Sequence, residues 1–119
     1  MPGISIHVVD VSRGVVAAGM RVQVLSEGDV RHLPTEIASG VVAASGLLEH
    51  PALAGPFQPG FYYAIFEAAE YFQTTGVSLP DPPFLDSFIY RFGIADPDQH
   101  YHLPMKLTPW GYSCFRGGA

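Results

Sequence analysis

The sequence HYHLPMKLTPWGYSCFRGGA, residues 100–119, says more about the fold of this chain than any other stretch. Because a β-strand repeats every two residues, alternate side chains in the first half of this stretch lie on opposite faces. The even-numbered face holds His100, His102, Pro104 and Lys106. The odd-numbered face holds Tyr101, Leu103, Met105 and Leu107. We therefore predict a strand with an apolar face for the core and a polar face that can carry chemistry.

Other segments show strand patterns as well. They are rich in β-branched or aromatic residues and are bounded by turn residues: residues 4–11, 20–25, 61–66 and 84–92. Residues 41–59 are mostly small residues, proline and glycine, and we predict a further strand there with irregular ends. Residues 67–75 predict a short helix that ends near Gly76. Short strands at intervals of roughly ten residues predict an all-β sandwich.

Length and charge narrow the class of protein. The chain has 119 residues, of which 48% are hydrophobic, and a single core serves chains of about 100 to 150 residues. We therefore expect one domain over residues 1–119. The formal net charge is -5, and the six basic residues are scattered singly. Because nucleic-acid binding needs clustered Lys and Arg, we expect no nucleic-acid partner.

Targeting signals are not expected. Residues 1–11 lack a basic region and include His7 and Asp10, so they predict a strand and not a secretory signal. No run approaches the roughly eighteen apolar residues that a membrane span needs. Cys114 is the single cysteine and cannot form an internal disulfide, which fits a reducing compartment. We expect a cytoplasmic protein without a membrane partner, in which Cys114 is a small buried side chain and not a nucleophile.

Both ends of the chain carry short motifs that contain histidine. The carboxyl end has HYHLP at residues 100–104, PWGYS at 109–113 and CFRGG at 114–118, and the amino end has IHVVD at 6–10. These motifs, in this order, resemble those of the transthyretin-related 5-hydroxyisourate hydrolases. The resemblance implies a transthyretin-like (immunoglobulin-like) β-sandwich of about seven to eight strands with one short helix.

The resemblance also implies an active site built on two histidines. The family brings together the histidine of its first motif, here His7, and the second histidine of HYH, here His102. Imidazole has an ordinary pKa of about 6.5, so it can take and return a proton near neutrality. One imidazole would deprotonate water or substrate while the other protonates the leaving group. We predict His7 and His102 as catalytic residues.

Three site positions depart from the family motifs. The family's catalytic arginine follows a turn that corresponds to Ser45-Gly46-Leu47, so the Leu47 side chain replaces a guanidinium. Phe115 stands in place of a tyrosine, and Gly118 in place of a terminal serine. Removing an arginine aimed at developing charge typically costs about 3 kcal/mol of transition-state stabilisation. These changes predict a flatter and more apolar ligand than a ureido ring.

The predicted substrate-binding residues surround the two histidines: Leu47, Phe115, Arg116, His100, Pro104 and Gly118. For Arg116 the alternative is a structural contact near the carboxyl terminus. His100, His102 and His7 together would offer three imidazoles, the number that a catalytic zinc uses. The resemblance implies no obligatory metal, and we predict neither a metal nor a cofactor.

Three functions are consistent with the sequence. The favoured one is a divergent enzyme of this hydrolase family that uses the histidine pair on a cyclic, relatively apolar small molecule, for example in secondary metabolism. The alternative is a genuine 5-hydroxyisourate hydrolase of purine (urate) catabolism. The third is a non-catalytic, transthyretin-like protein that binds a hydrophobic ligand. The resemblance implies a homotetramer, a dimer of dimers, with the small molecule in a channel between subunits.

Overall fold

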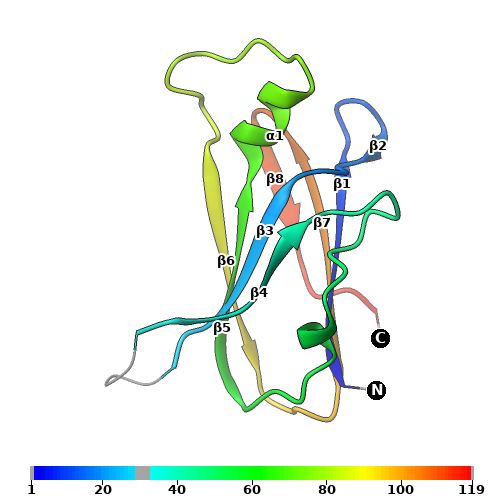
Figure 1. Ribbon diagram of the computed structural model, residues 1–119, viewed down its shortest axis with the longest axis vertical. Helices are drawn as coiled ribbons and strands as arrows, with labels where there is room; N and C mark the ends of the chain where they lie inside the picture. Colours follow the sequence, from blue (N-terminus) through cyan, green and yellow to red (C-terminus); the bar gives the residue numbers. More distant parts are fainter. Residues whose placement is uncertain (1, 29–32, 119) are drawn as a thin grey trace.

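The computed structural model describes residues 2–28 and 33–118 and shows two β-sheets packed against each other (Figure 1). Over these residues the chain has eight strands and one α-helix, which confirms the predicted sandwich. The elements are β1 (Gly3–Asp10), β2 (Val15–Val16), β3 (Arg21–Ser26), β4 (Thr35–Val41), the 3-10 helix η1 (Pro51–Ala54), β5 (Gly60–Glu67), α1 (Ala68–Thr74), β6 (Ser87–Ile94), β7 (His100–Thr108) and β8 (Gly111–Cys114). No helix in the described ranges is long and apolar enough to cross a membrane.

The two sheets differ in how their strands are connected. One, called the β1 sheet here, has the order β2-β1-β7-β8, and the other, the β3 sheet, has the order β4-β3-β5-β6. β1 and β7 run parallel, from Gly3 opposite His100 to Asp10 opposite Leu107. A parallel pair needs a long crossover connection, and here the whole chain between β1 and β7 supplies it. Segments from the two ends of the sequence therefore lie side by side (Figure 1).

The core lies between the sheets and follows the alternation of the strands. Ile6 and Val8 of β1 are fully buried, and Leu103 and Met105 of β7 are at most 2% exposed. The β3 sheet contributes buried side chains from its inner face: Val22, Val24, Ala64 and Phe66. Truncating a large side chain in such a core typically costs about 2–5 kcal/mol. The predicted division of residues 100–107 into a buried and an outward face is confirmed.

The predicted strand over residues 41–59 is wrong. β4 ends at Val41, and the residues that follow form isolated bridges and the helix η1. Pro51, Pro56 and Pro59 lack the N–H that a strand ladder uses, so this segment cannot continue in a sheet. The other predicted strands and the short helix are present, with ends that differ by a few residues.

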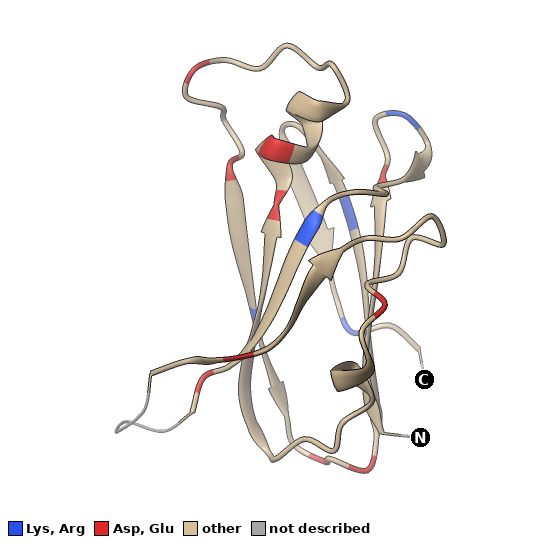
Figure 2. Ribbon diagram, in the orientation of Figure 1, with Lys and Arg blue, Asp and Glu red and all other residues tan. Residues whose placement is uncertain are grey.

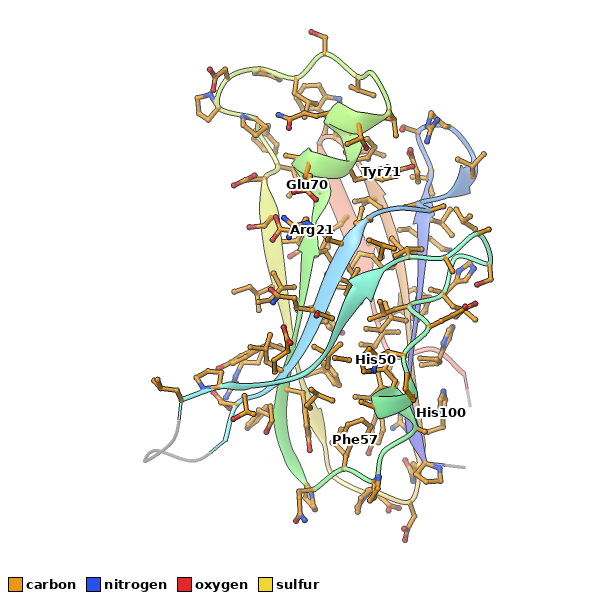
Figure 3. All side chains as sticks on the ribbon, viewed as in Figure 1. Arg21, His50, Phe57, Glu70, Tyr71 and His100 are labelled. Atoms are coloured by element: carbon orange, nitrogen blue, oxygen red, sulfur yellow. The ribbon has the colours of Figure 1, made fainter. Side chains whose placement is uncertain are left out.

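Ion pairs on the surface are isolated from one another. Arg21 of β3 and Glu70 of α1 point toward each other (Figure 3), with both nitrogen–oxygen distances at 2.6 Å. Arg91 lies 2.9 Å from Glu27. In Figure 2 the Lys and Arg residues of the described ranges lie singly on separate elements. Exposed pairs of this kind contribute little to stability.

Asp10 is fully buried at the end of β1, with a side chain that faces the core and not the solvent. Its carboxylate accepts hydrogen bonds from the Ser12 amide at 3.1 Å, from Arg13 Nε at 3.1 Å and from the Tyr71 hydroxyl at 2.9 Å. Arg13 Nη2 also donates to the Tyr71 hydroxyl at 2.8 Å. Because Tyr71 belongs to α1 (Figure 3), this network fastens the helix to the end of β1.

The network lowers the pKa of Asp10. Burial alone raises this pKa, but the hydrogen bonds from Ser12, Arg13 and Tyr71 outweigh burial. A carboxyl group with a lowered pKa in the folded state stabilises the fold above the pKa of the unfolded chain, about 3.9. That stability is lost as the pH falls through the pKa of the folded state.

Replacing Asp10 by Asn is expected to lower the free energy of unfolding at neutral pH by about 1–3 kcal/mol, because buried donors lose their charged acceptor. Urea denaturation measures this difference from the wild type. The difference should shrink as the pH falls below about 3.9, the pKa of the unfolded chain, because the unfolded wild type then binds a proton that the folded state takes up only at its lower pKa. Asp98→Asn, at an exposed position, is the control. A difference that stayed constant down to about pH 3 would contradict a role for the Asp10 charge.

Candidate functional site

Two histidines from opposite ends of the sequence share the outward face of the β1 sheet. Ser5 and His7 of β1, and His102 and Pro104 of β7, are all partly exposed between buried neighbours. The parallel register places Ser5 opposite His102 and His7 opposite Pro104. His7 and His102 are therefore diagonal neighbours on adjacent strands, and long side chains can interact across such a diagonal.

Ser5 connects the two histidines of β7. Its Oγ lies 2.6 Å from Nδ1 of His102 and 2.8 Å from Nε2 of His100. The other ring nitrogen of His100 (Figure 3) lies 3.5 Å from the Pro2 carbonyl oxygen. A hydroxyl can donate one hydrogen bond and accept two, so one serine can hold both rings in place.

The segment that follows β4 lies beside His7. Residues 46–48 lie along the free edge of β1, where Leu47 forms an antiparallel bridge with His7. Nε2 of His7 is 3.2 Å from the Ser45 carbonyl oxygen. Bridge partners point to the same side of a sheet, so Leu47 lies on the histidine face, whereas Leu48 is buried.

Two glycines leave room for the imidazoles. A Cβ atom on Gly46 would lie 2.5 Å from Nε2 of His7, and its φ of +87° belongs to the left-handed region that favours glycine. The amide of Gly117 donates to the His102 carbonyl oxygen at 2.7 Å. A Cβ atom on Gly117 would lie 2.8 Å from Cδ2 of His102. Both positions therefore require the smallest residue while the rings stay where they are.

The carboxyl-terminal residues reach the same face. Gly117 continues the register of β8 and lies opposite His102, so Phe115, two residues earlier, points to the histidine side. Phe115 is 47% exposed. Gly118 is exposed, and a Cβ atom there would have open space around it.

Arg116 lies on the opposite side of the sheet from the histidines. Its guanidinium carbon is 4.2 Å from the centroid of the Tyr101 ring, and its Nη2 donates to the Gln99 side-chain oxygen at 2.8 Å. Tyr101 belongs to the buried face of β7. The structure therefore does not bring Arg116 to the other predicted substrate-binding residues, because its guanidinium lies against Tyr101 and Gln99.

Cys114 is half-buried and packs against the core. Burial raises the pKa of its thiol to about 11, and a backbone hydrogen bond lowers it only in part. The thiolate is the nucleophilic form of cysteine. At neutral pH Cys114 is therefore a protonated and weakly reactive side chain.

The structure gathers most of the predicted site residues on one face of the β1 sheet: His7, Leu47, His100, His102, Pro104 and Phe115. Their catalytic and binding roles stay predictions. Ser5, which the sequence reasoning did not assign to the site, could have been found by its spacing of two residues from His7. Within the described ranges, no group of three or more His, Cys, Asp and Glu side chains is placed to hold a metal ion.

Residues 4–117 match the model of the HIUase/Transthyretin family. The chain belongs to this family. It is 42% identical over 113 residues to 5-hydroxyisourate hydrolase 2 of Rhizobium meliloti (strain 1021), covering 93% of this chain and 92% of that protein. It is 41% identical over 118 residues to a 5-hydroxyisourate hydrolase of Deinococcus radiodurans, covering 98% and 96%. The predicted family is thus confirmed.

Two solved structures resemble the fold. The 5-hydroxyisourate hydrolase of Klebsiella pneumoniae superposes with a TM-score of 0.80 at 28% identity, covering 99% of this chain and 100% of that one. A crystal structure of (S)-allantoin synthase superposes with a TM-score of 0.89 at 35% identity, covering 98% of this chain but 43% of that one. These matches confirm the transthyretin-like sandwich, and the curated relatives support the prediction of a hydrolase.

Gly117→Ala is expected to displace the His102 ring, because the new Cβ atom would lie 2.8 Å from Cδ2. NMR of the histidine ring protons should show His102 shifted while His50, whose ring caps η1, is unchanged. Overpacking a site in this way typically costs about 1–3 kcal/mol. Gly118→Ala has open space and is the matched control. An unshifted His102 resonance in Gly117→Ala would contradict the tight contact.

Proposed function

We propose that this chain is a 5-hydroxyisourate hydrolase, the alternative that the sequence left beside a divergent enzyme. The observation that carries the proposal is the register of β1 and β7, which puts His7 and His102 on one outward face. The names of the relatives support it as well, because proteins 42% and 41% identical to this chain are called 5-hydroxyisourate hydrolases.

The proposed chemistry divides proton transfer between the two imidazoles. His102 takes a proton from the water whose oxygen bonds to a ring carbonyl carbon of the substrate. His7, whose Nε2 faces the Ser45 carbonyl oxygen, is the acid. It delivers a proton to the ring nitrogen as the carbon–nitrogen bond breaks. Water is consumed and the ring opens, with no change of oxidation state. A positioned acid or base typically accelerates such a step by about 10²- to 10⁴-fold.

Leu47 makes this site less polar than the family motif implies. It lies beside His7, where the resemblance implies an arginine, and Pro104 and Phe115 add further apolar surface. Developing negative charge would then be stabilised without a guanidinium, at a cost of several kcal/mol, typically about 3. This observation favours a second candidate, acid–base chemistry on a cyclic and more apolar molecule by the same two histidines.

The test is to add freshly prepared 5-hydroxyisourate to the purified protein and follow its loss by ultraviolet absorbance against the spontaneous rate. We expect acceleration by the wild type and a loss of at least about 100-fold in kcat for His102→Ala, because the base is removed. His50→Asn is the matched control. It removes an imidazole that accepts a hydrogen bond from Ala52 in η1, and asparagine preserves this cap.

Leu47→Arg distinguishes the two candidates. In a 5-hydroxyisourate hydrolase the added guanidinium should raise kcat/KM by about 10-fold or more, within the range that one such contact supplies. Leu47→Met, similar in volume but uncharged, is its control. If neither the wild type nor Leu47→Arg accelerates ring opening, the hydrolase proposal is wrong, and the apolar-substrate candidate becomes the one to pursue.

We also propose that the chain assembles as a homotetramer. β6 and β8 are edge strands of their sheets, and edge strands with exposed apolar residues need to be covered. Ile89 of β6 is 58% exposed, and Trp110 and Tyr112 at β8 are 59% and 46% exposed. Sedimentation equilibrium at assay concentration is expected to give four times the chain mass of 12.9 kDa. A monomeric mass would contradict the tetramer but would leave the proposed roles of His7 and His102 unchanged.

A further inference from the structure

We propose that Ser5 and His100 are positioning residues that fix the tautomer of His102, so that its Nε2 carries no proton and faces the substrate. This inference deepens the proposed function, because it rests on His102 as the base. It starts from three hydrogen-bond contacts that run in series from the Pro2 carbonyl through His100 and Ser5 to His102.

The direction of the series is set at its outer end. The Pro2 carbonyl oxygen can only accept a hydrogen bond, so a hydrogen bond across the 3.5 Å contact with Nδ1 of His100 is donated by Nδ1. A neutral imidazole carries one proton. With that proton on Nδ1, Nε2 of His100 has a lone pair and accepts from its partner.

Ser5 passes this direction on to His102. Its single hydroxyl proton points to Nε2 of His100 at 2.8 Å, which leaves Oγ with lone pairs only. The contact of 2.6 Å between Ser5 Oγ and His102 Nδ1 is then donated by an Nδ1–H group. Neutral His102 therefore carries its proton on Nδ1, and its Nε2 is free to take another.

The reverse direction is unfavourable for neutral rings. If Ser5 donated to His102, then Nε2 of His100 would have to donate to Ser5, and Nδ1 of His100 would present a lone pair to the Pro2 carbonyl oxygen. Two acceptors would then face each other at 3.5 Å without a proton between them. The observed contacts thus select one tautomer for each ring.

This arrangement has a consequence for catalysis. When His102 takes a proton from water at Nε2, the resulting imidazolium keeps its Nδ1–H bond to Ser5, and no second proton has to move. A base whose ring must first exchange tautomers loses much of its contribution, as happens when the partner that orients a catalytic histidine is altered. Ser5 contacts the base directly, and His100 acts on it through Ser5.

Tautomers are read directly by NMR of protein labelled with ¹⁵N-histidine, at a pH about two units above the ordinary imidazole pKa of roughly 6.5. For the wild type we expect His102 to show a protonated Nδ1 and an unprotonated Nε2. In His100→Phe, Ser5 loses its acceptor and is free to donate to His102, so the Nε2–H form should become the major one. A wild-type His102 with its proton on Nε2 would overturn the inference.

Kinetics supply the second readout. Ser5→Ala is expected to lower kcat for ring opening by about 10- to 100-fold, part of what a positioned base supplies, with KM changed by less than about 2-fold. Ser5→Thr keeps the hydroxyl and should restore most of kcat. Ser113→Ala, a serine of β8 whose side chain lies outside this series, is the matched control. Equal activity of Ser5→Ala and wild type would sink the proposed role.

Failure of the inference and failure of the proposed function look different. If the wild type does not open the ring, the function is wrong, while the NMR experiment still decides the tautomer. If the wild type is active but His102 carries its proton on Nε2, only the inference is wrong. Should Ser5→Ala fail to fold, the tautomer of His102 in the wild type and in His100→Phe still decides the question.

Discussion

The parallel ladder between β1 and β7 is the constraint on which both the core and the candidate site depend. A shift of one residue in this pairing would exchange the faces of the strand and expose its apolar side chains. Burial of Ile6 and Leu103 therefore fixes the register. The same register decides which outward side chains meet, so the free energy of the core also sets the geometry around His102.

Alternation lets one short strand serve two purposes. Asp10 and His7 are three residues apart on β1 and so lie on opposite faces. Asp10 points inward and joins β1 to Tyr71 of α1, while His7 points outward beside Leu47. The structural network and the candidate site are thus neighbours in sequence and separated by the sheet.

Local patterns and family motifs were enough to predict the strand faces at the carboxyl end and the two site histidines. Alternation gave the faces of residues 100–107, and the motifs at the two ends gave His7 and His102. The pairing of β1 with β7 could not be read locally, because it joins residues such as Gly3 and His100 from the two ends of the chain. The spacing of two residues from His7 puts Ser5 on the histidine face, but its position opposite His102 depends on this long-range pairing. The motif also did not reveal that Arg116 lies against Tyr101 and Gln99, away from the histidine face.

The position of Leu47 has a meaning for how this scaffold can change. The segment beside β1 is held by backbone bonds, such as the Val8 amide to the Gly46 carbonyl at 2.9 Å, and these are the same for any side chain at the next position. Residue 47 therefore borders the histidine face without carrying the fold. A single substitution there can alter the chemical preference of the site while the sandwich persists. Residue 47 can therefore change with little loss of stability.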